Sequence, residues 1–168
     1  MRLVFSIVYI AAMGILSHFI GEALPRRWFD PEKRPYAQLP FESNGMIYRA
    51  LRVQAWKDRL PDMSKIMPDM VKKSISAAAS SAEAGRVALE TCVAEAVHWV
   101  LLLLSFPIYL ICPDWAGALL AVLYGLSHIP FIIIQRYNRP TLVRLARRLK
   151  EREERIRHAH TDTDSQHG

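Results

Sequence analysis

Three long apolar runs divide this chain, and polar, basic segments separate them. The runs cover residues 3–24, 92–111 and 115–135, and each is close to the roughly 20 residues that a helix needs to cross a bilayer. The second and third runs are joined only by Cys112-Pro113-Asp114, which predicts a tight antiparallel hairpin. The pattern predicts an all-α integral membrane protein, with about three transmembrane helices in a single domain over residues 1–168.

The segment of residues 25–90 between the first two runs has no stretch long enough to cross a membrane. Gly45–Leu60 alternates apolar and basic residues. It predicts an amphipathic helix that lies on the lipid surface with Trp56 as its anchor, or one that packs on its neighbours with a solvated basic face. Ser74–Leu89 is rich in Ala and Ser and is expected to lead helically into the second span.

Prolines and charge shape the remaining expectations. Pro107 and Pro130 are expected to kink the second and third spans or to loosen a turn. After Pro140, leucines spaced by three and four residues predict a separate amphipathic helix in the basic tail, residues 136–168. The last residues, Thr161–Gly168, are expected to have no regular structure.

The distribution of cations predicts the topology. Residues 25–90 hold twelve Lys and Arg, the chain from Gln135 onward holds nine, and the hairpin link holds none. The positive-inside rule then places both basic segments in the cytoplasm, with the hairpin and the N-terminus outside. Cations beside spans also contact anionic lipids, so nucleic acid is not an expected partner. The first run resembles a cleaved signal peptide, but Pro25-Arg26-Arg27 and a poor cleavage site favour a retained span in the cell membrane.

Polar side chains gather at the inner edge of the predicted spans. Helical steps of three, four and seven residues return to nearly the same face, so Thr91, Glu95 and His98 share one arc of the second span. Ionisable side chains at membrane depth cost about 2.5 kcal/mol or more and usually mark function. The other two spans bring three further candidates to this depth: His18, Glu22 and His128. We expect one site that faces the cytoplasm.

A Glu-His pair suits acid-base chemistry. Neutral His98 could take a proton from a hydroxyl that attacks an activated carbonyl, with Glu95 fixing the ring and stabilising the imidazolium. Arg136 and Arg139 could steady a phosphate or an oxyanion at the water boundary, or could simply be stop-transfer charges. The chain has no Gly-x-Ser-x-Gly elbow, P-loop or Cys-x-x-Cys pair, which disfavours a serine hydrolase, an NTPase and a zinc finger.

The same residues allow a metal alternative. Glu95-Ala-Val-His98 has the Glu-x-x-His spacing of di-iron helix bundles. Its further ligands would be His18, Glu22 and His128, although the two histidines also suit polar contacts between helices. A complete di-iron site wants two such motifs, so a homo-oligomer would have to supply the second. We expect no bound metal.

Two motifs carry a family resemblance. They are Glu-Thr-x-x-Ala-Glu-x-x-His-Trp over residues 90–99 and Pro-x-Ile-Ile-x-Gln-Arg-Tyr-Asn-Arg-Pro over residues 130–140. Weaker matches lie at Pro25, Phe29, Phe41, Glu42, Gly45, Trp56 and Lys57. Over most of residues 24–157 the chain resembles the glycosyl-4,4'-diaponeurosporenoate acyltransferases, small membrane proteins of carotenoid biosynthesis. His98 and Glu95 lie within the family pattern, whereas His18, Cys92 and His128 do not.

The resemblance implies transfer of a fatty acyl chain to a hydroxyl of a membrane glycolipid, a carotenoid glycoside or a similar lipid. The donor would be acyl-CoA or acyl-carrier-protein, with no bound cofactor. The residues expected to bind acceptor or donor are Glu90, Thr91, Trp99, Gln135, Arg136, Tyr137, Asn138 and Arg139. The alternatives are a non-catalytic partner of a lipid-modifying enzyme and a metal-dependent membrane oxidoreductase.

Overall fold

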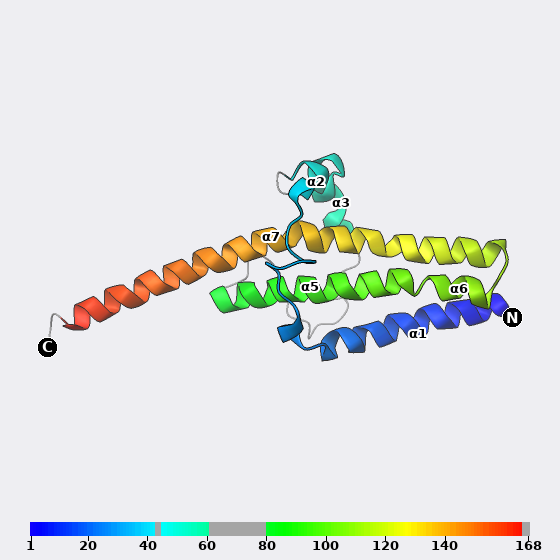
Figure 1. Ribbon diagram of the computed structural model, residues 1–168, viewed down its shortest axis with the longest axis horizontal. Helices are drawn as coiled ribbons and strands as arrows, with labels where there is room; N and C mark the ends of the chain where they lie inside the picture. Colours follow the sequence, from blue (N-terminus) through cyan, green and yellow to red (C-terminus); the bar gives the residue numbers. More distant parts are fainter. Residues whose placement is uncertain (43–44, 61–79, 166–168) are drawn as a thin grey trace.

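Helices form all the regular structure in the part of the chain that the computed structural model describes, residues 1–42, 45–60 and 80–165. Three long rods lie side by side in Figure 1: α1 (Arg2–Ala23), α5 (Ser81–Leu103) continued by α6 (Phe106–Ile111), and α7 (Trp115–Ser165). All three rods are long and apolar enough to cross a membrane. The predicted all-α fold is confirmed among the described residues, with three long helices that could cross a membrane.

The α5–α7 pair is the centre of the bundle, and α1 packs against α5 and α6. Helix α1 buries only Ser6 and leaves large apolar side chains such as Phe5 and Phe19 more than half exposed. An unpartnered apolar surface of this kind suits contact with lipid tails. The N-terminus and the α6–α7 turn lie at the same end of the bundle (Figure 1), as an antiparallel three-span arrangement requires.

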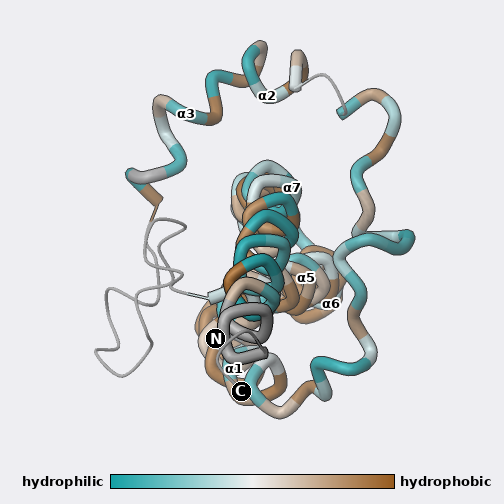
Figure 2. Tube along the Cα trace, turned by 90° about the vertical axis from the view of Figure 1, so that its left-hand side faces the viewer, coloured by the Kyte–Doolittle hydropathy of each residue, from teal (hydrophilic) through white to brown (hydrophobic). Residues whose placement is uncertain are grey.

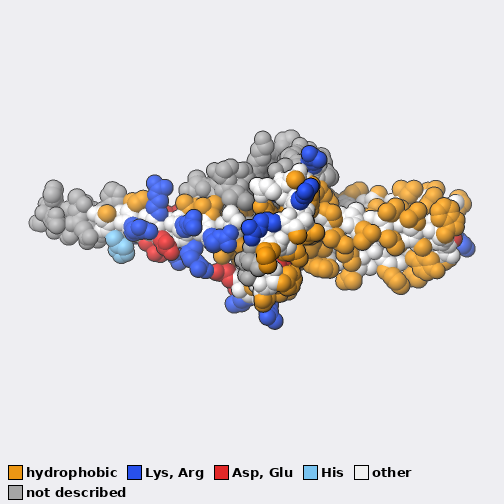
Figure 3. All heavy atoms as spheres, turned by 90° about the horizontal axis from the view of Figure 1, so that it is seen from above, with side chains coloured by type: hydrophobic (Ala, Val, Ile, Leu, Met, Phe, Trp, Pro, Cys, Tyr) orange, Lys and Arg blue, Asp and Glu red, His pale blue; other side chains and the backbone are white. Residues whose placement is uncertain are grey.

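Apolar and charged side chains separate along the molecule. Figure 3 shows apolar side chains over the half that holds α1, α6 and the start of α7, and Lys and Arg over the other half. Beyond the start of α5, α7 extends alone (Figure 1). The boundary between the two halves is the level at which α1 ends and the connecting segment of residues 24–60 begins.

The prolines act differently from one another. Helix α5 ends at Leu103 and α6 begins at Phe106 with Pro107 in its first turn, where the missing N–H needs no partner. The helix is thus interrupted just before Pro107, in agreement with the kink or loosened turn expected there. Pro130 and Pro140 lie inside α7, which runs without interruption to Ser165. The prediction of a separate tail helix is wrong, because the third span and the tail form one helix. The prediction of irregular structure is wrong for residues 161–165, and residues 166–168 lie outside the described part.

The connecting segment is more broken than its pattern predicts. The single helix expected over residues 45–60 is instead α2 (Met46–Ala50), α3 (Val53–Trp56) and the 3-10 turn η3 (Lys57–Arg59). Arg52, with φ of 49°, lies in the left-handed region and ends the first helix. Figure 2 shows this segment arching around the long helices. The helix expected from Ser74 begins, among the described residues, at Ser81, with the Ser80 hydroxyl accepting from the Glu83 N–H at 3.2 Å. Residues 74–79 lie outside the described part.

Candidate active site

A buried carboxylate joins the two central helices. Glu95 of α5 is 3% exposed, and each of its oxygens accepts a hydrogen bond from a different arginine of α7. Arg136 Nη1 lies 2.9 Å from Glu95 Oε1, and Arg139 Nη2 lies 2.5 Å from Oε2. The arginines are three residues apart, so they lie on one face of α7 and hold the carboxylate between them.

A second carboxylate completes the cluster from the connecting segment. Glu42, at the end of the 3-10 turn η2 (Pro40–Glu42), accepts two hydrogen bonds from Arg136, at 2.7 and 2.8 Å. It also accepts from the Tyr48 hydroxyl at 2.8 Å and from the Leu39 N–H at 2.7 Å. Burial acts to raise the pKa of Glu42, but these hydrogen bonds outweigh it and leave the pKa below its ordinary value. Glu42 is therefore a charged acceptor that fixes the segment to α7.

Arg139 is the most deeply enclosed member of the cluster. It is 2% exposed and donates to the hydroxyl of Thr91 at 2.8 Å and to the carbonyl of Thr91 at 2.9 Å. It also donates to the carbonyl of Tyr36 at 2.8 Å, and its guanidinium lies 5.3 Å from the centre of the Tyr36 ring. Residues 36–42, α5 and α7 are thus tied together at one place.

The geometry changes the expected role of these arginines. The sequence predicts that Arg136 and Arg139 either bind a donor phosphate or an oxyanion or are stop-transfer charges. Arg136 instead donates to two carboxylates and to the carbonyls of Pro35 and Ala37. Arg139 is equally occupied. Removing one partner of a buried ion pair of this kind destabilises a protein by about 3–5 kcal/mol. The main role of both arginines is therefore to hold the elements of the site together.

Among the described residues, no hydrogen bond joins His98 to Glu95. Its Nδ1 lies 3.2 Å from Nδ1 of His128 on α7, and its ring stacks on Phe131 with the ring centres 4.7 Å apart. We expected the Glu95 carboxylate to fix the His98 ring. The structure corrects this, because the two arginines and, at 3.4 Å, the Trp99 indole N–H take the carboxylate oxygens. His128 orients the His98 ring instead. The sequence predicts only a polar contact between helices or a metal-ligand role for His128.

His128 is itself enclosed. It is 7% exposed, and its ring meets Tyr124 edge-on with the centres 4.7 Å apart. Its Nε2 has no hydrogen-bond partner among the described residues. Two imidazoles in contact through Nδ1 must share one proton there, so one ring donates and the other accepts.

The other expected site residues divide between the cluster and its surroundings. Glu90 pairs with Arg26 at 2.9 Å and so fixes the end of α1 to α5.

The Tyr137 hydroxyl bonds to Gln54 of α3, and Asn138 has a buried Oδ1 without a partner in the described part of the chain. Gln135 is partly exposed. Cys92 is fully buried, with its thiol 3.6 Å from the Ala88 carbonyl.

The alternative metal ligands do not form a set. Glu22 is exposed, the His18 ring contacts that of Phe19, Glu95 faces the arginines, and His98 pairs with His128. The described residues contain no group of three or more His, Cys, Asp and Glu side chains that could hold a metal ion.

These features define a multi-pass membrane protein with ionisable chemistry where its spans meet the basic segments. The chain belongs to the glycosyl-4,4'-diaponeurosporenoate acyltransferase family, whose family model matches residues 25–148, and it is an acyltransferase. It is 28% identical to the glycosyl-4,4'-diaponeurosporenoate acyltransferase of Staphylococcus aureus strain bovine RF122 / ET3-1 over 137 residues, which are 81% of this chain and 82% of the relative. It is 27% identical, with the same coverage, to that of strain USA300. No solved structure matches.

Proposed function

We propose that the protein transfers a fatty acyl chain from a thioester donor to a sugar hydroxyl of a membrane glycolipid. The name of the relatives indicates a carotenoid glycoside as the acceptor. The observation that carries the proposal is the His98–His128 pair, placed within the apolar spans and next to the buried cluster of arginines and carboxylates. An amphipathic acceptor would keep its tail among the apolar side chains of the spans and bring its sugar to the His98–His128 pair.

His98 is the proposed general base. If its Nδ1–H donates to His128 Nδ1, the lone pair of His98 lies on Nε2, and Nε2 of His128 carries the other proton. His98 is half-buried whereas His128 is buried, so we take Nε2 of His98 to be the atom that meets a hydroxyl. His128 is then a positioning residue, and Phe131 holds the plane of the His98 ring by stacking.

The reaction balances with these groups alone. The acceptor oxygen attacks the thioester carbonyl carbon while His98 Nε2 takes the hydroxyl proton. The ester C–O bond forms and the C–S bond breaks. The imidazolium returns its proton to the departing thiolate. Glu95, Arg136 and Arg139 keep α5 and α7 in register so that the two histidines meet.

The lipids of strains that carry variants test this proposal. The gene is deleted, restored, and restored as His98→Ala, and the lipids are compared by mass spectrometry. We expect deletion and His98→Ala both to lose one acylated glycolipid and to accumulate its unacylated parent, because removal of a general base lowers turnover by about 100-fold or more.

A matched histidine provides the control. His18→Ala changes a histidine of α1 whose ring contacts that of Phe19, so it should restore the acylated lipid fully. Membrane levels of each variant, measured by immunoblot, separate loss of chemistry from loss of protein. Full restoration by His98→Ala would refute the role of His98 as the base.

A further inference from the structure

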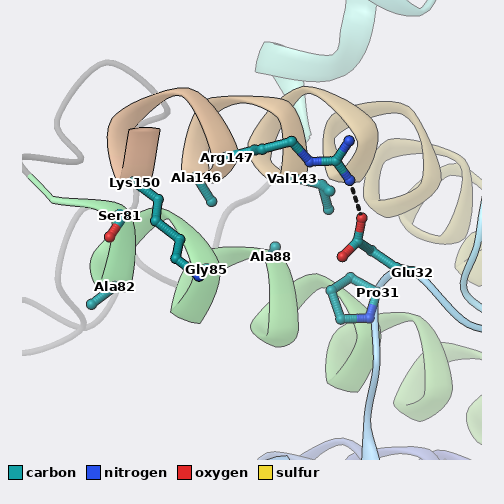
Figure 4. A pocket seen from close by; sticks show the side chains of 10 residues that line it. All are labelled: Pro31, Glu32, Ser81, Ala82, Gly85, Ala88, Val143, Ala146, Arg147 and Lys150. Atoms are coloured by element: carbon teal, nitrogen blue, oxygen red, sulfur yellow. Dashed lines mark hydrogen bonds and ion pairs between the residues drawn. The ribbon is translucent and has the colours of Figure 1, made fainter. Parts of the chain in front are cut away.

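A groove lies on the polar side of the buried cluster, where α5 begins and α7 continues past it. Its volume is about 370 Å³. Small side chains form its floor, among them Gly85 and Ala88 of α5 and Ala146 of α7 (Figure 4). A Cβ added at Gly85 would meet nothing within 4 Å, so the space above this residue is open.

Two cations of α7 border the groove. Figure 4 shows the Lys150 side chain pointing from α7 toward the groove, and Lys150 has no ion pair or hydrogen bond among the described residues. Arg147 pairs with Glu32 on the opposite wall at 2.6 Å, with the two side chains 67% and 58% exposed. Exposed pairs of this kind contribute at most about 1 kcal/mol, so a stronger anion can replace the carboxylate.

The position of the groove favours a ligand that comes from water rather than a lipid headgroup. The edge of the span is marked by Arg26, just after α1, which pairs with Glu90. Gly85 is five residues before Glu90 on α5, and therefore about 7 Å further from the membrane core. The headgroup region adds only about 5 to 7 Å on each side of the hydrocarbon, so the groove opens at its outer limit.

The proposed reaction needs a donor with such chemistry. A fatty acyl thioester on a phosphopantetheine arm carries a phosphate at its far end, and the arginines first expected to bind it are held in buried ion pairs. We infer that Lys150 and Arg147 bind the phosphate of the acyl-phosphopantetheine donor in this groove, an inference that rests on the proposed function. His98 is 13 residues further along α5, about 20 Å, a distance that the pantetheine arm between the phosphate and the thioester must cover.

Donor kinetics of the full-length protein in lipid nanodiscs test the inference. Palmitoyl-CoA is the donor, and Gly85→Leu and Lys150→Ala are compared with the wild type. Both variants should raise the KM for the donor by roughly tenfold with kcat nearly unchanged, because one fills the groove and the other removes a charged hydrogen-bond donor. Arg148→Ala removes a neighbouring exposed cation that does not line the groove, and it should leave KM unchanged.

Separate measurements distinguish failure of this inference from failure of the proposed function. An unchanged KM in both groove variants, with activity still lost in His98→Ala, would overturn the groove assignment alone. Binding of free coenzyme A, measured by calorimetry, tests the groove even if no acyl transfer is seen, and it should be weakened in Lys150→Ala. A KM that depends on phosphatidylglycerol content in the wild type but not in the groove variants would assign the groove to a lipid headgroup and refute the donor. Palmitoyl-carrier-protein in a parallel series shows which phosphopantetheine thioester is used.

Discussion

At the scale of single residues, the site depends on which polar atoms are neighbours. Glu95 and His98 lie three residues apart on one helix, close enough to interact. This spacing alone does not determine which hydrogen-bond partner each side chain has. The α7 arginines provide charge-assisted hydrogen bonds that an imidazole cannot match, so the carboxylate turns to them. His98 then meets the nearest polar group left on α7, which is His128.

Glu42 gives a prediction at this scale. Its pKa is lower in the folded protein than its ordinary value of 4.5, so its contribution to stability is fully present above pH 4.5 and is lost as the pH falls through the lower, folded value. The thermal midpoint of the detergent-solubilised protein should therefore drop on acidification in this range. Glu42→Gln should be less stable at neutral pH and should lose less on acidification. An identical pH profile for the two proteins would contradict the role of Glu42 as a charged anchor.

At the scale of elements, the apolar pattern predicts the spans well and their ends poorly. The position of each span follows from the free-energy cost of placing polar groups in hydrocarbon. This cost is visible in the sequence as a long run of apolar residues. Pro140 suggested a boundary, but α7 passes through it, since local propensity is a weaker constraint than packing along α5. The Gly45–Leu60 segment breaks because Tyr48 and Val53 are buried, a tertiary demand that helical periodicity does not reveal.

The tight turn between α6 and α7 gives a prediction at this scale. A Cβ at Gly117 would lie 1.8 Å from the Cys112 carbonyl oxygen, so Gly117→Ala must force the turn open. The expected loss is about 1–3 kcal/mol or more, seen as a lower thermal midpoint in detergent. Gly14→Ala is the matched control in α1, where an added Cβ meets nothing within 4 Å, and it should be neutral or slightly stabilising. Equal midpoints for the two variants would show that the turn is not packed as described.

At the scale of the whole molecule, the cluster of arginines and carboxylates lies where the connecting segment meets α5 and α7, and the His98–His128 pair lies within the apolar spans. The number of spans, the location of polar chemistry at their ends and the family could all be predicted from the sequence. The role of Glu42 could not, because a single carboxylate in a proline-rich segment has no local signal, and only its match to the family pointed to it. The groove could not be predicted either. Gly85 and Ala146 have no distinguishing sequence pattern, and the groove exists only because α5 and α7 pack together.

Acyl transfer by the purified protein tests the central claim most directly. The wild type and His98→Ala, each in lipid nanodiscs, receive radiolabelled palmitoyl-CoA and glycosyl-4,4'-diaponeurosporenoate, and the labelled ester is counted over time. The account predicts label in the acylated glycoside with the wild type and a loss of about 100-fold or more with His98→Ala, at equal amounts of folded protein. Equal rates for the two proteins, or no labelled ester with the wild type, would contradict it.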